Sequence, residues 1–207
     1  MVKNNEGFDY DLDTARQKGN LFEKIFHNGR VNFWLSKLEY KNKKILDVGC
    51  NTGILLIPLM EKGADAWGID ISEGDIAKVK GKLKDKGLPT GRVKVADARK
   101  IPFPNSTFDL VILSDVLEHI SSPEKAAKEA IRVIKPGGRA YVTVPNSWHP
   151  VVKYPWVRKL LTGRKDVDEH LDVPYNKQKL IKLFPKNKVL KVGTTGFWSE
   201  IFGVFTK

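Results

Sequence analysis

The stretch Ile45-Leu46-Asp47-Val48-Gly49-Cys50-Asn51-Thr52-Gly53 decides the fold of this chain. Its apolar first half is typical of a buried β-strand, and its glycines indicate a tight turn that opens a helix. Asp70 ends the next apolar run, 17 residues after Gly53. A buried strand, a glycine turn and an acidic residue in this order predict a site for a nucleoside-bearing cofactor at the edge of a parallel sheet.

Strand patterns and helix patterns alternate on both sides of this stretch. The alternation predicts an α/β fold, namely a Rossmann-like, doubly wound and mostly parallel seven-stranded sheet with right-handed crossovers. The last two apolar runs are close enough to pair as a hairpin, so we expect an antiparallel C-terminal hairpin strand. The expected strands are 44–48, 66–70, 92–96, 108–113, 139–144, 188–192 and 200–206. The expected helices are 21–38, 52–62, one capped by Ser72, one capped by Ser122 and 177–184.

The length of 207 residues suits one domain with a full hydrophobic core. After Val144 the alternation stops, and residues 145–174, with four prolines, are too many for an ordinary connection. We therefore expect an insertion that covers the acceptor site. The expected single domain, 1–207, consists of an N-terminal helical segment at 1–40, a cofactor-binding core at 41–144, the insertion at 145–187 and closing strands at 188–207.

Composition and net charge indicate which cellular compartment and which binding partners are plausible for this protein. No apolar run approaches the ~20 residues that span a bilayer, so no transmembrane segment is expected. The single cysteine, Cys50, has no partner for an internal disulfide, which favours a cytoplasmic protein. The net charge is +12, of which residues 148–207 carry +7. This excess would attract RNA, a nucleotide or a lipid headgroup, although a solvated surface rich in lysine explains it more simply.

The glycine spacing separates two cofactor classes. A nicotinamide dinucleotide usually has Gly-x-Gly-x-x-Gly for its pyrophosphate, whereas this chain has Gly49-x-x-x-Gly53 preceded by Asp47. A carboxylate this close disfavours a pyrophosphate and suits a ligand with an ammonium group. S-adenosylmethionine, with adenosine, an amino acid terminus and a sulfonium, fits better. Asp70 is placed to accept hydrogen bonds from ribose hydroxyls, and Ile71 to pack on the adenine ring.

Four segments in series then resemble one known family. The chain looks like a class I S-adenosylmethionine-dependent methyltransferase of the type 11 group, a resemblance that covers residues 44–146. The matching segments are ILDVGCNTG at 45–53, GIDIS at 68–72, ADARKIPFPNSTFDLVILSDVLEHI at 96–120 and IKPGGRAYVTVPN at 134–146. The family usually has glycine where this chain has Asn51, and Asn is the residue after glycine that best tolerates a left-handed backbone.

The resemblance implies a set of cofactor contacts. It implies that the turn binds the methionine end, that Asp70 binds the ribose, that Asp97 and Ala98 meet the adenine edge, and that Ser114 and Asp115 face the methionine portion. The cofactor-binding candidates are Asp47, Gly49, Cys50, Asn51, Gly53, Asp70, Ile71, Asp97, Ala98, Ser114 and Asp115.

Each of these residues also has a plain structural interpretation. Gly53 would simply permit close packing, Asp70 would cap the following helix and Asp97 would form a turn. Cys50 fits a small buried filler better than a nucleophile, because no base is suggested beside it. The ordered set favours the functional interpretation over these alternatives.

Methyl transfer needs a base only when the acceptor must lose a proton. His119 follows the fourth expected strand and is the first candidate for that base, with a structural role in the loop as the equal alternative. Within the insertion, His149, Tyr154 and His170 are candidate substrate contacts, or they pack the insertion onto the domain. The histidines and Cys50 lack tight ligand spacing, so no metal is predicted.

The sequence therefore predicts a methyltransferase that uses S-adenosylmethionine on a small-molecule or lipid-like acceptor. One alternative is an RNA methyltransferase, motivated by the basic C-terminal part. A second is a cofactor-binding protein without turnover. A third, a nicotinamide oxidoreductase, is disfavoured by the glycine spacing. The acceptor atom and the oligomeric state stay open.

Overall fold

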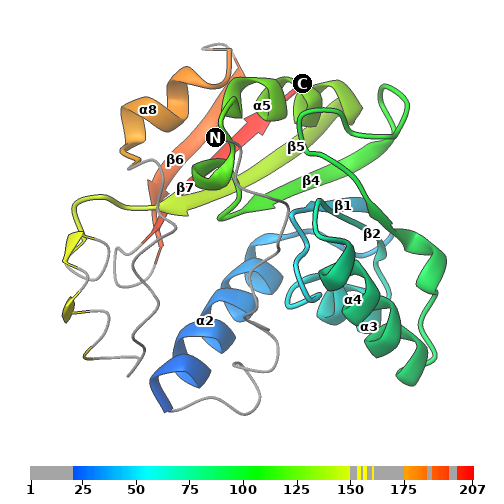
Figure 1. The fold of residues 1–207 in the computed structure, drawn as a ribbon. Coiled ribbons are helices and arrows are strands. Elements are labelled where there is room, and N and C mark those ends of the chain that lie inside the picture. The colour runs from blue at the N-terminus through cyan, green and yellow to red at the C-terminus, as the bar shows by residue number, and fades with distance from the viewer. Residues whose placement is uncertain are drawn as a thin grey trace. The chain divides into compact units, whose positions relative to one another are not determined.

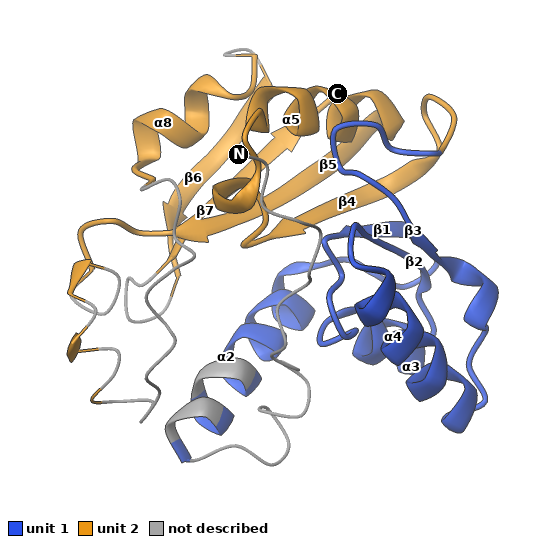
Figure 2. Ribbon diagram, in the orientation of Figure 1, with its two compact units in different colours: residues 1–102 blue, residues 103–207 orange. Residues whose placement is uncertain are grey.

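The computed structural model describes residues 21–149, 153–154, 156–157, 160, 175–185, 188–195 and 200–207. The contacts divide the chain into two compact units, residues 1–102 and residues 103–207 (Figure 2). Each unit is described by itself below. The single domain over 1–207, with its four parts, stays a prediction.

The first unit consists of short strands and the helices between them (Figure 1). Its strands run parallel in the order β3-β2-β1, because buried apolar runs follow one another through helical crossovers. Helices α3 and α4 pack against β2, and α4 also packs against β3. The elements are α2 (Leu21–Lys37), β1 (Lys44–Val48), α3 (Leu56–Glu61), β2 (Asp65–Asp70), α4 (Glu73–Asp85), the 3-10 turn η1 (Thr90–Arg92) and β3 (Val93–Val95).

Two helix starts in this unit follow from local chemistry. The prediction of a helix from residue 52 was wrong, since α3 begins at Leu56. The late start puts Pro58 in the first turn, where a missing N–H costs little. The prediction for Ser72 is confirmed, because its Oγ accepts a hydrogen bond from the backbone N–H of Asp75 at 3.1 Å.

The second unit holds four strands in the order β4-β5-β7-β6. Strands β4 and β5 pair parallel, and β7 runs antiparallel to both β5 and β6. The predicted α/β class with seven strands, mostly parallel, and an antiparallel strand at the C-terminus is thus confirmed. The elements are β4 (Phe108–Ser114), the 3-10 turn η2 (Leu117–His119), α5 (Pro123–Val133), β5 (Ile134–Pro145), α8 (Lys177–Lys182), β6 (Val189–Thr194) and β7 (Glu200–Thr206).

One local prediction for this unit is confirmed in position and another was wrong. Ser122 lies at the N-cap of α5 and Pro123 opens the helix, as predicted, although the Ser122 side chain makes no capping hydrogen bond. Strand β5 begins at Ile134 rather than at residue 139, directly after the helix. Its pairing with β4 shifts register between Phe108 and Leu110, and Gly137 takes a φ of 77°. The irregular start of this strand therefore includes Pro136, Gly137 and Gly138.

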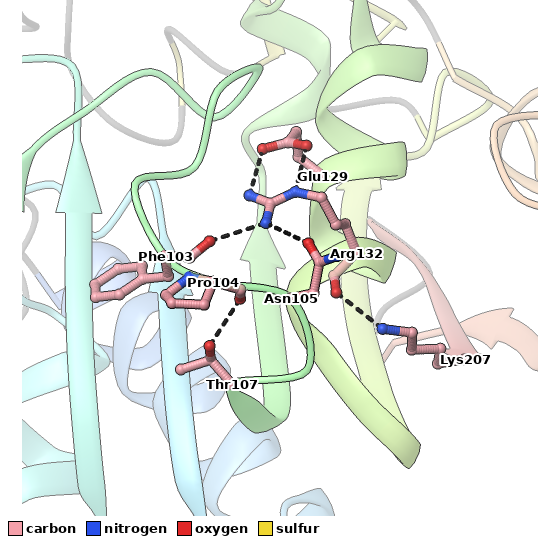
Figure 3. Close-up of polar contacts among 7 residues, drawn as sticks. All are labelled: Phe103, Pro104, Asn105, Thr107, Glu129, Arg132 and Lys207. Carbon is pink, nitrogen blue, oxygen red and sulfur yellow. Dashed lines mark hydrogen bonds and ion pairs between the residues drawn. The ribbon is translucent and has the colours of Figure 1, made fainter.

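Arg132 connects the loop before β4 to helix α5 and to the C-terminus (Figure 3). Its guanidinium donates to both carboxylate oxygens of Glu129, at 2.7 and 2.8 Å, and to the carbonyl of Phe103 at 2.9 Å. Its own carbonyl accepts from Lys207 Nζ at 2.9 Å. The loop that leads into β4 is held by charged hydrogen bonds, so the direction in which β4 enters the sheet is well determined.

No helix among the described residues is long and apolar enough to cross a membrane.

Candidate functional site

The turn after β1 contains three residues with left-handed backbone. Gly49, Asn51 and Gly53 have φ values of 70°, 45° and 86°. The N–H groups of Gly49 and Cys50 both donate to the carbonyl of Ile69, at 2.8 and 3.0 Å. This ties the turn to the end of β2. Asn51 keeps the conformation that glycine usually supplies, since Asn tolerates the left-handed region.

Gly53 is required for space as well as for backbone angle. A Cβ at this position would lie 2.9 Å from Ile57 Cδ1 in the helix that follows. The structural interpretation, in which Gly53 permits close packing, therefore holds alongside its place in the turn. A Cβ on Gly68 of β2 would likewise lie 2.9 Å from the sulfur of Cys50. Burial raises the pKa of the Cys50 thiol, as expected for an inert packed side chain.

Asp70 is fixed at the end of β2 by two backbone donors. Its Oδ2 accepts from the N–H of Asn51 at 2.8 Å, and its Oδ1 from the N–H of Ser72 at 3.0 Å. Each carboxylate oxygen has a further acceptor direction, so the group has room for two more donors. Ser72, and not Asp70, caps α4. Burial raises the pKa of Asp70, while the bonds from Ser72 and Asn51 partly oppose that rise.

Asp47 lies within β1 and is almost fully buried. Burial, and next the nearby charge of Asp70, raise the pKa of Asp47 to about 8. The carboxyl is therefore mostly protonated at neutral pH in the ligand-free protein. A cationic group beside it would favour the ionised form, so this position matches a ligand that carries an ammonium group.

Asn51 supplies a specific test of whether S-adenosylmethionine fits here. Its Nδ2 donates to Asp75 Oδ2 at 3.4 Å, whereas its Oδ1 is buried and accepts no hydrogen bond. A buried acceptor without a donor is costly. Ile71, which follows Asp70, leaves 48% of its surface exposed. Hydroxyl and ammonium donors would satisfy the amide oxygen, and a flat apolar ring would cover Ile71, so the residues present fit this cofactor.

Asp97 lies close to Asp70 along the sheet edge, because Ala96 N–H donates to the Asp70 carbonyl at 2.8 Å. Its side chain is paired with Arg99, at 2.7 Å from Oδ2 to the guanidinium, and this hydrogen bond lowers the pKa of Asp97. Sequence reasoning missed the Arg99 pair, although an aspartate two residues before an arginine is the available signal. The adenine contacts of Asp97 and Ala98 stay predictions.

In the second unit, Ser114 is the last residue of β4 and Asp115 follows it. Ser114 Oγ lies 3.2 Å from Thr143 Oγ1 of β5, and the N–H of Asp115 donates to the Thr143 carbonyl at 3.1 Å. Asp115 has a left-handed φ of 53°. Thr143 is a fully buried partner that the sequence did not single out. Whether Ser114 and Asp115 face the methionine portion stays a prediction.

His119 closes the short turn η2, directly after the buried carboxyl of Glu118. The His119 Nε2 lies 4.0 Å from Glu118 Oε1, and about a third of the imidazole side chain is exposed. A partly exposed imidazole beside a buried carboxylate is a group that can accept a proton, because the carboxylate stabilises the resulting imidazolium.

Tyr175 supports this turn from a distant part of the chain. It is fully buried, and its hydroxyl donates to the Leu117 carbonyl at 3.3 Å. Burial, and next the charge of Glu118, raise the pKa of Tyr175 to about 12, so the hydroxyl stays a donor. Sequence analysis did not single out Tyr175. Its contact with Leu117 spans 58 positions, which no local pattern shows.

The candidate substrate contacts are described in part. The N–H of His149 donates to the Asn146 carbonyl at 2.9 Å, and Tyr154 is exposed, with its ring 6.5 Å from that of Trp156. His170 lies outside the described residues. Within the described ranges, no group of three or more His, Cys, Asp or Glu side chains could hold a metal ion.

Comparisons with known proteins agree with this geometry. The family model described as "Methyltransferase domain" matches residues 46–142. A ubiquinone biosynthesis O-methyltransferase from Pseudomonas fluorescens is 26% identical over 184 residues, which are 86% of this chain and 71% of that protein.

Solved structures of similar fold include one archaeal protein and one bacterial protein. One, from Pyrococcus horikoshii OT3, has a TM-score of 0.73 and 22% identity, covering 93% of this chain and 95% of the other. A SAM-dependent methyltransferase from Aquifex aeolicus has a TM-score of 0.69 and 18% identity, covering 95% and 98%. At these identities the structures show a shared fold.

Proposed function

We propose that this chain, whose residues 46–142 match the methyltransferase domain model, is a class I S-adenosylmethionine-dependent methyltransferase of the type 11 group and that it methylates a hydroxyl of a small, lipid-like acceptor. The observation that carries the cofactor assignment is Asp70, whose two oxygens are each fixed by one backbone donor beside the buried Asp47. The name of the Pseudomonas relative motivates the hydroxyl acceptor.

The cofactor supplies an electrophilic methyl group on a sulfonium. For the protein, we propose that the turn and Asp47 hold the ammonium end and that Asp70 accepts from the ribose hydroxyls. Asn51 Oδ1 gains a donor from the same ligand, and Ile71 packs against the adenine. These residues bind and orient; alignment and the exclusion of water account for most of the rate enhancement in methyl transfer.

A hydroxyl acceptor must lose its proton as the new bond to carbon forms. We propose that His119 accepts this proton, and that Glu118 stabilises the imidazolium from 4.0 Å away. The segment 145–187 shapes the acceptor site, with His149, Tyr154 and His170 as candidate contacts. We propose a cytoplasmic enzyme. The comparisons give no support to the alternatives of an RNA substrate or of cofactor binding without turnover.

Transfer of a labelled methyl group to fractionated cell extract tests the function. The expected result is label in a lipid-extractable, low-molecular-weight fraction that resists mild base, as a methyl ether does. Label in RNA would support the RNA alternative instead. Binding of S-adenosylhomocysteine without any labelled fraction would support the alternative without turnover.

Paired histidine variants test the base. We expect His119→Gln to lower kcat at least tenfold and to flatten the acidic limb of the pH–rate profile, while affinity for S-adenosylhomocysteine stays unchanged. His149→Gln serves as the matched control and should keep the acidic limb. An unchanged pH profile in His119→Gln would assign His119 to the alternative role, closing the loop.

A further inference from the structure

Tyr175 lies where two distant parts of the second unit meet. Its backbone forms a parallel bridge with Asn146, and its carbonyl accepts from the N–H of Ser147 at 3.1 Å, just after β5 ends. Its hydroxyl donates to the Leu117 carbonyl at 3.3 Å, at the start of the turn η2. One buried residue therefore contacts both the turn that ends in the proposed base and the chain that leaves β5.

Tyr175 is itself fixed by its surroundings. The next residue, Asn176, caps α8, because its side chain accepts a hydrogen bond from the N–H of Lys179 at 2.8 Å. Leu180 of this helix is fully buried, and α8 packs on β6 and β7. The ring of Tyr175 is buried too, with Lys179 Nζ 5.0 Å from its centre. A side chain whose ring and backbone are fixed loses little entropy when its hydroxyl forms a hydrogen bond.

The turn that Tyr175 contacts has few strong bonds of its own. It consists of three residues of 3-10 helix and has no side-chain cap. The N–H of His119 donates to the Val116 carbonyl at 3.1 Å, and that of Ile120 donates to the Leu117 carbonyl at 3.4 Å. Short 3-10 turns have poor hydrogen-bond geometry. The bond from Tyr175 therefore adds a tertiary restraint two residues before His119.

We propose that Tyr175 is a positioning residue, whose hydroxyl holds the turn so that His119 keeps a fixed place relative to the chain that follows β5. This inference rests on the proposed function, because it needs His119 as the group that accepts the proton of the acceptor hydroxyl. A base works within hydrogen-bond reach of that proton, about 2.6–3.2 Å, and a misplacement of about 1 Å costs about 100-fold in rate. A loosened turn should therefore slow proton transfer and leave cofactor binding unchanged.

Amide hydrogen exchange tests the restraint without any acceptor. The Tyr175→Phe variant keeps the buried ring and loses the hydroxyl. We expect the N–H groups of His119 and Ile120 to exchange roughly five- to tenfold faster in the variant, as the loss of one hydrogen bond predicts. The N–H of Ser147, which donates to the backbone of Tyr175, is the internal reference and should exchange at the wild-type rate. Equal exchange at His119 and Ile120 in the two proteins would overturn the proposal.

A double-variant cycle tests whether Tyr175 acts through His119. Methyl transfer is measured with labelled S-adenosylmethionine and the lipid-extractable fraction of cell extract as acceptor. We expect Tyr175→Phe to lower the maximal rate about three- to tenfold, at unchanged affinity for S-adenosylhomocysteine. In a chain that already carries His119→Gln, it should lower the rate no further. General destabilisation would instead add to the loss caused by His119→Gln, so additive losses would contradict the positioning role.

Tyr141→Phe is the matched control. Tyr141 is a buried tyrosine within β5, so this variant also removes one hydroxyl from the interior of the same unit. It should keep the wild-type maximal rate and the wild-type exchange at His119 and Ile120. An equal loss of rate in both phenylalanine variants would also count against the proposal, because the loss of any buried hydroxyl would then have the same effect.

Failure of the proposed function has a different signature. If the wild type transfers no methyl group to any fraction, the assignment of His119 as the base fails, whereas faster exchange in Tyr175→Phe would still show that Tyr175 holds the turn. If the wild type is active and the two losses are additive, the proposed function stands and the positioning role is contradicted.

Discussion

Residues 47–53 and residues 146–160 differ in what holds them and in what they offer. The first segment is fixed by left-handed backbone, by hydrogen bonds to β2 and by buried carboxyl groups. The second is anchored at Asn146 and Ser147 and exposes large apolar side chains. The difference separates a segment fixed by its backbone, which we propose binds the cofactor, from a segment with exposed side chains, which we propose meets the acceptor. Four predictions test that contrast.

The largest effect is expected at Asp70. Replacing Asp70 with Ala removes the acceptors for the ribose and leaves the N–H groups of Asn51 and Ser72 without their partner. Because hydrogen bonds to a charged group are worth about 1.5–3 kcal/mol, affinity for S-adenosylhomocysteine should fall roughly 10- to 100-fold. The control is Asp65→Ala at the start of the same strand, which breaks an ion pair with Arg92 and a hydrogen bond from the Trp67 indole but leaves the partners of Asp70 in place. Equal affinities in titration calorimetry would contradict the assignment of Asp70.

A second prediction compares two glycines of similar φ. Gly53→Ala should lower the free energy of unfolding by about 2–4 kcal/mol, since strain at φ +86° adds to a contact of 2.9 Å with Ile57. Gly63→Ala, at φ +83° with nothing within 4 Å, should cost about 1–2 kcal/mol. Urea unfolding measures both. If the free energy of unfolding falls by the same amount in both variants, the close contact with Ile57 does not add to the cost of Gly53→Ala.

The third prediction concerns the pH dependence that Asp47 causes. Its pKa of about 8 in the folded chain exceeds the value of 3.8 expected when unfolded, so the folded state binds more protons between these values. Stability from this group therefore falls as pH rises from about 4 to about 8. A ligand with an ammonium group favours the ionised form of Asp47, so its binding should release a proton. The affinity should therefore rise with pH, by up to about tenfold per pH unit, until about pH 8.

Two measurements check this prediction. Calorimetry of S-adenosylhomocysteine binding in buffers of different ionisation enthalpy counts the released protons. Thermal unfolding between pH 5 and pH 8 compares the wild type with Asp47→Asn, which should lack both pH dependences. Proton uptake on binding, or an identical pH dependence in the variant, would refute the role of Asp47.

The smallest effect is expected at Tyr175. Tyr175→Phe keeps the buried ring and removes the hydrogen bond to Leu117, which should cost about 0.5–1.5 kcal/mol in urea unfolding. Tyr154→Phe, at an exposed ring, should leave stability unchanged. A destabilisation of the same size in both variants would mean that the bond to Leu117 does not support the turn.

The contrast also explains what sequence analysis could and could not predict. The order of the strands, the glycine turn and the place of Asp70 at the end of β2 were predictable, because left-handed turns and buried parallel strands require particular residue types at fixed spacings. The start of α3 was not, since the residues between Gly53 and Leu56 fit a helix locally, whereas Gly53 takes a left-handed φ of 86° and α3 begins only at Leu56.

The side-chain partners were the least predictable part. The pairing of Asp97 with Arg99 competes with a functional interpretation of the same carboxylate, and the sequence shows both equally. Tyr175 reaches Leu117 across 58 positions, and the raised pKa of Asp47 depends on burial by the whole unit. Such contacts follow from tertiary packing, which a pattern along one chain does not encode.

The structure of the protein crystallised with S-adenosylhomocysteine tests the central claim most directly. The account predicts the ribose hydroxyls on the carboxylate of Asp70, the amino acid end at the turn of residues 49–53 beside Asp47, and a ligand donor on Asn51 Oδ1. Well-ordered crystals in which the ligand is absent from this turn, or is bound with its ribose away from Asp70, would contradict it.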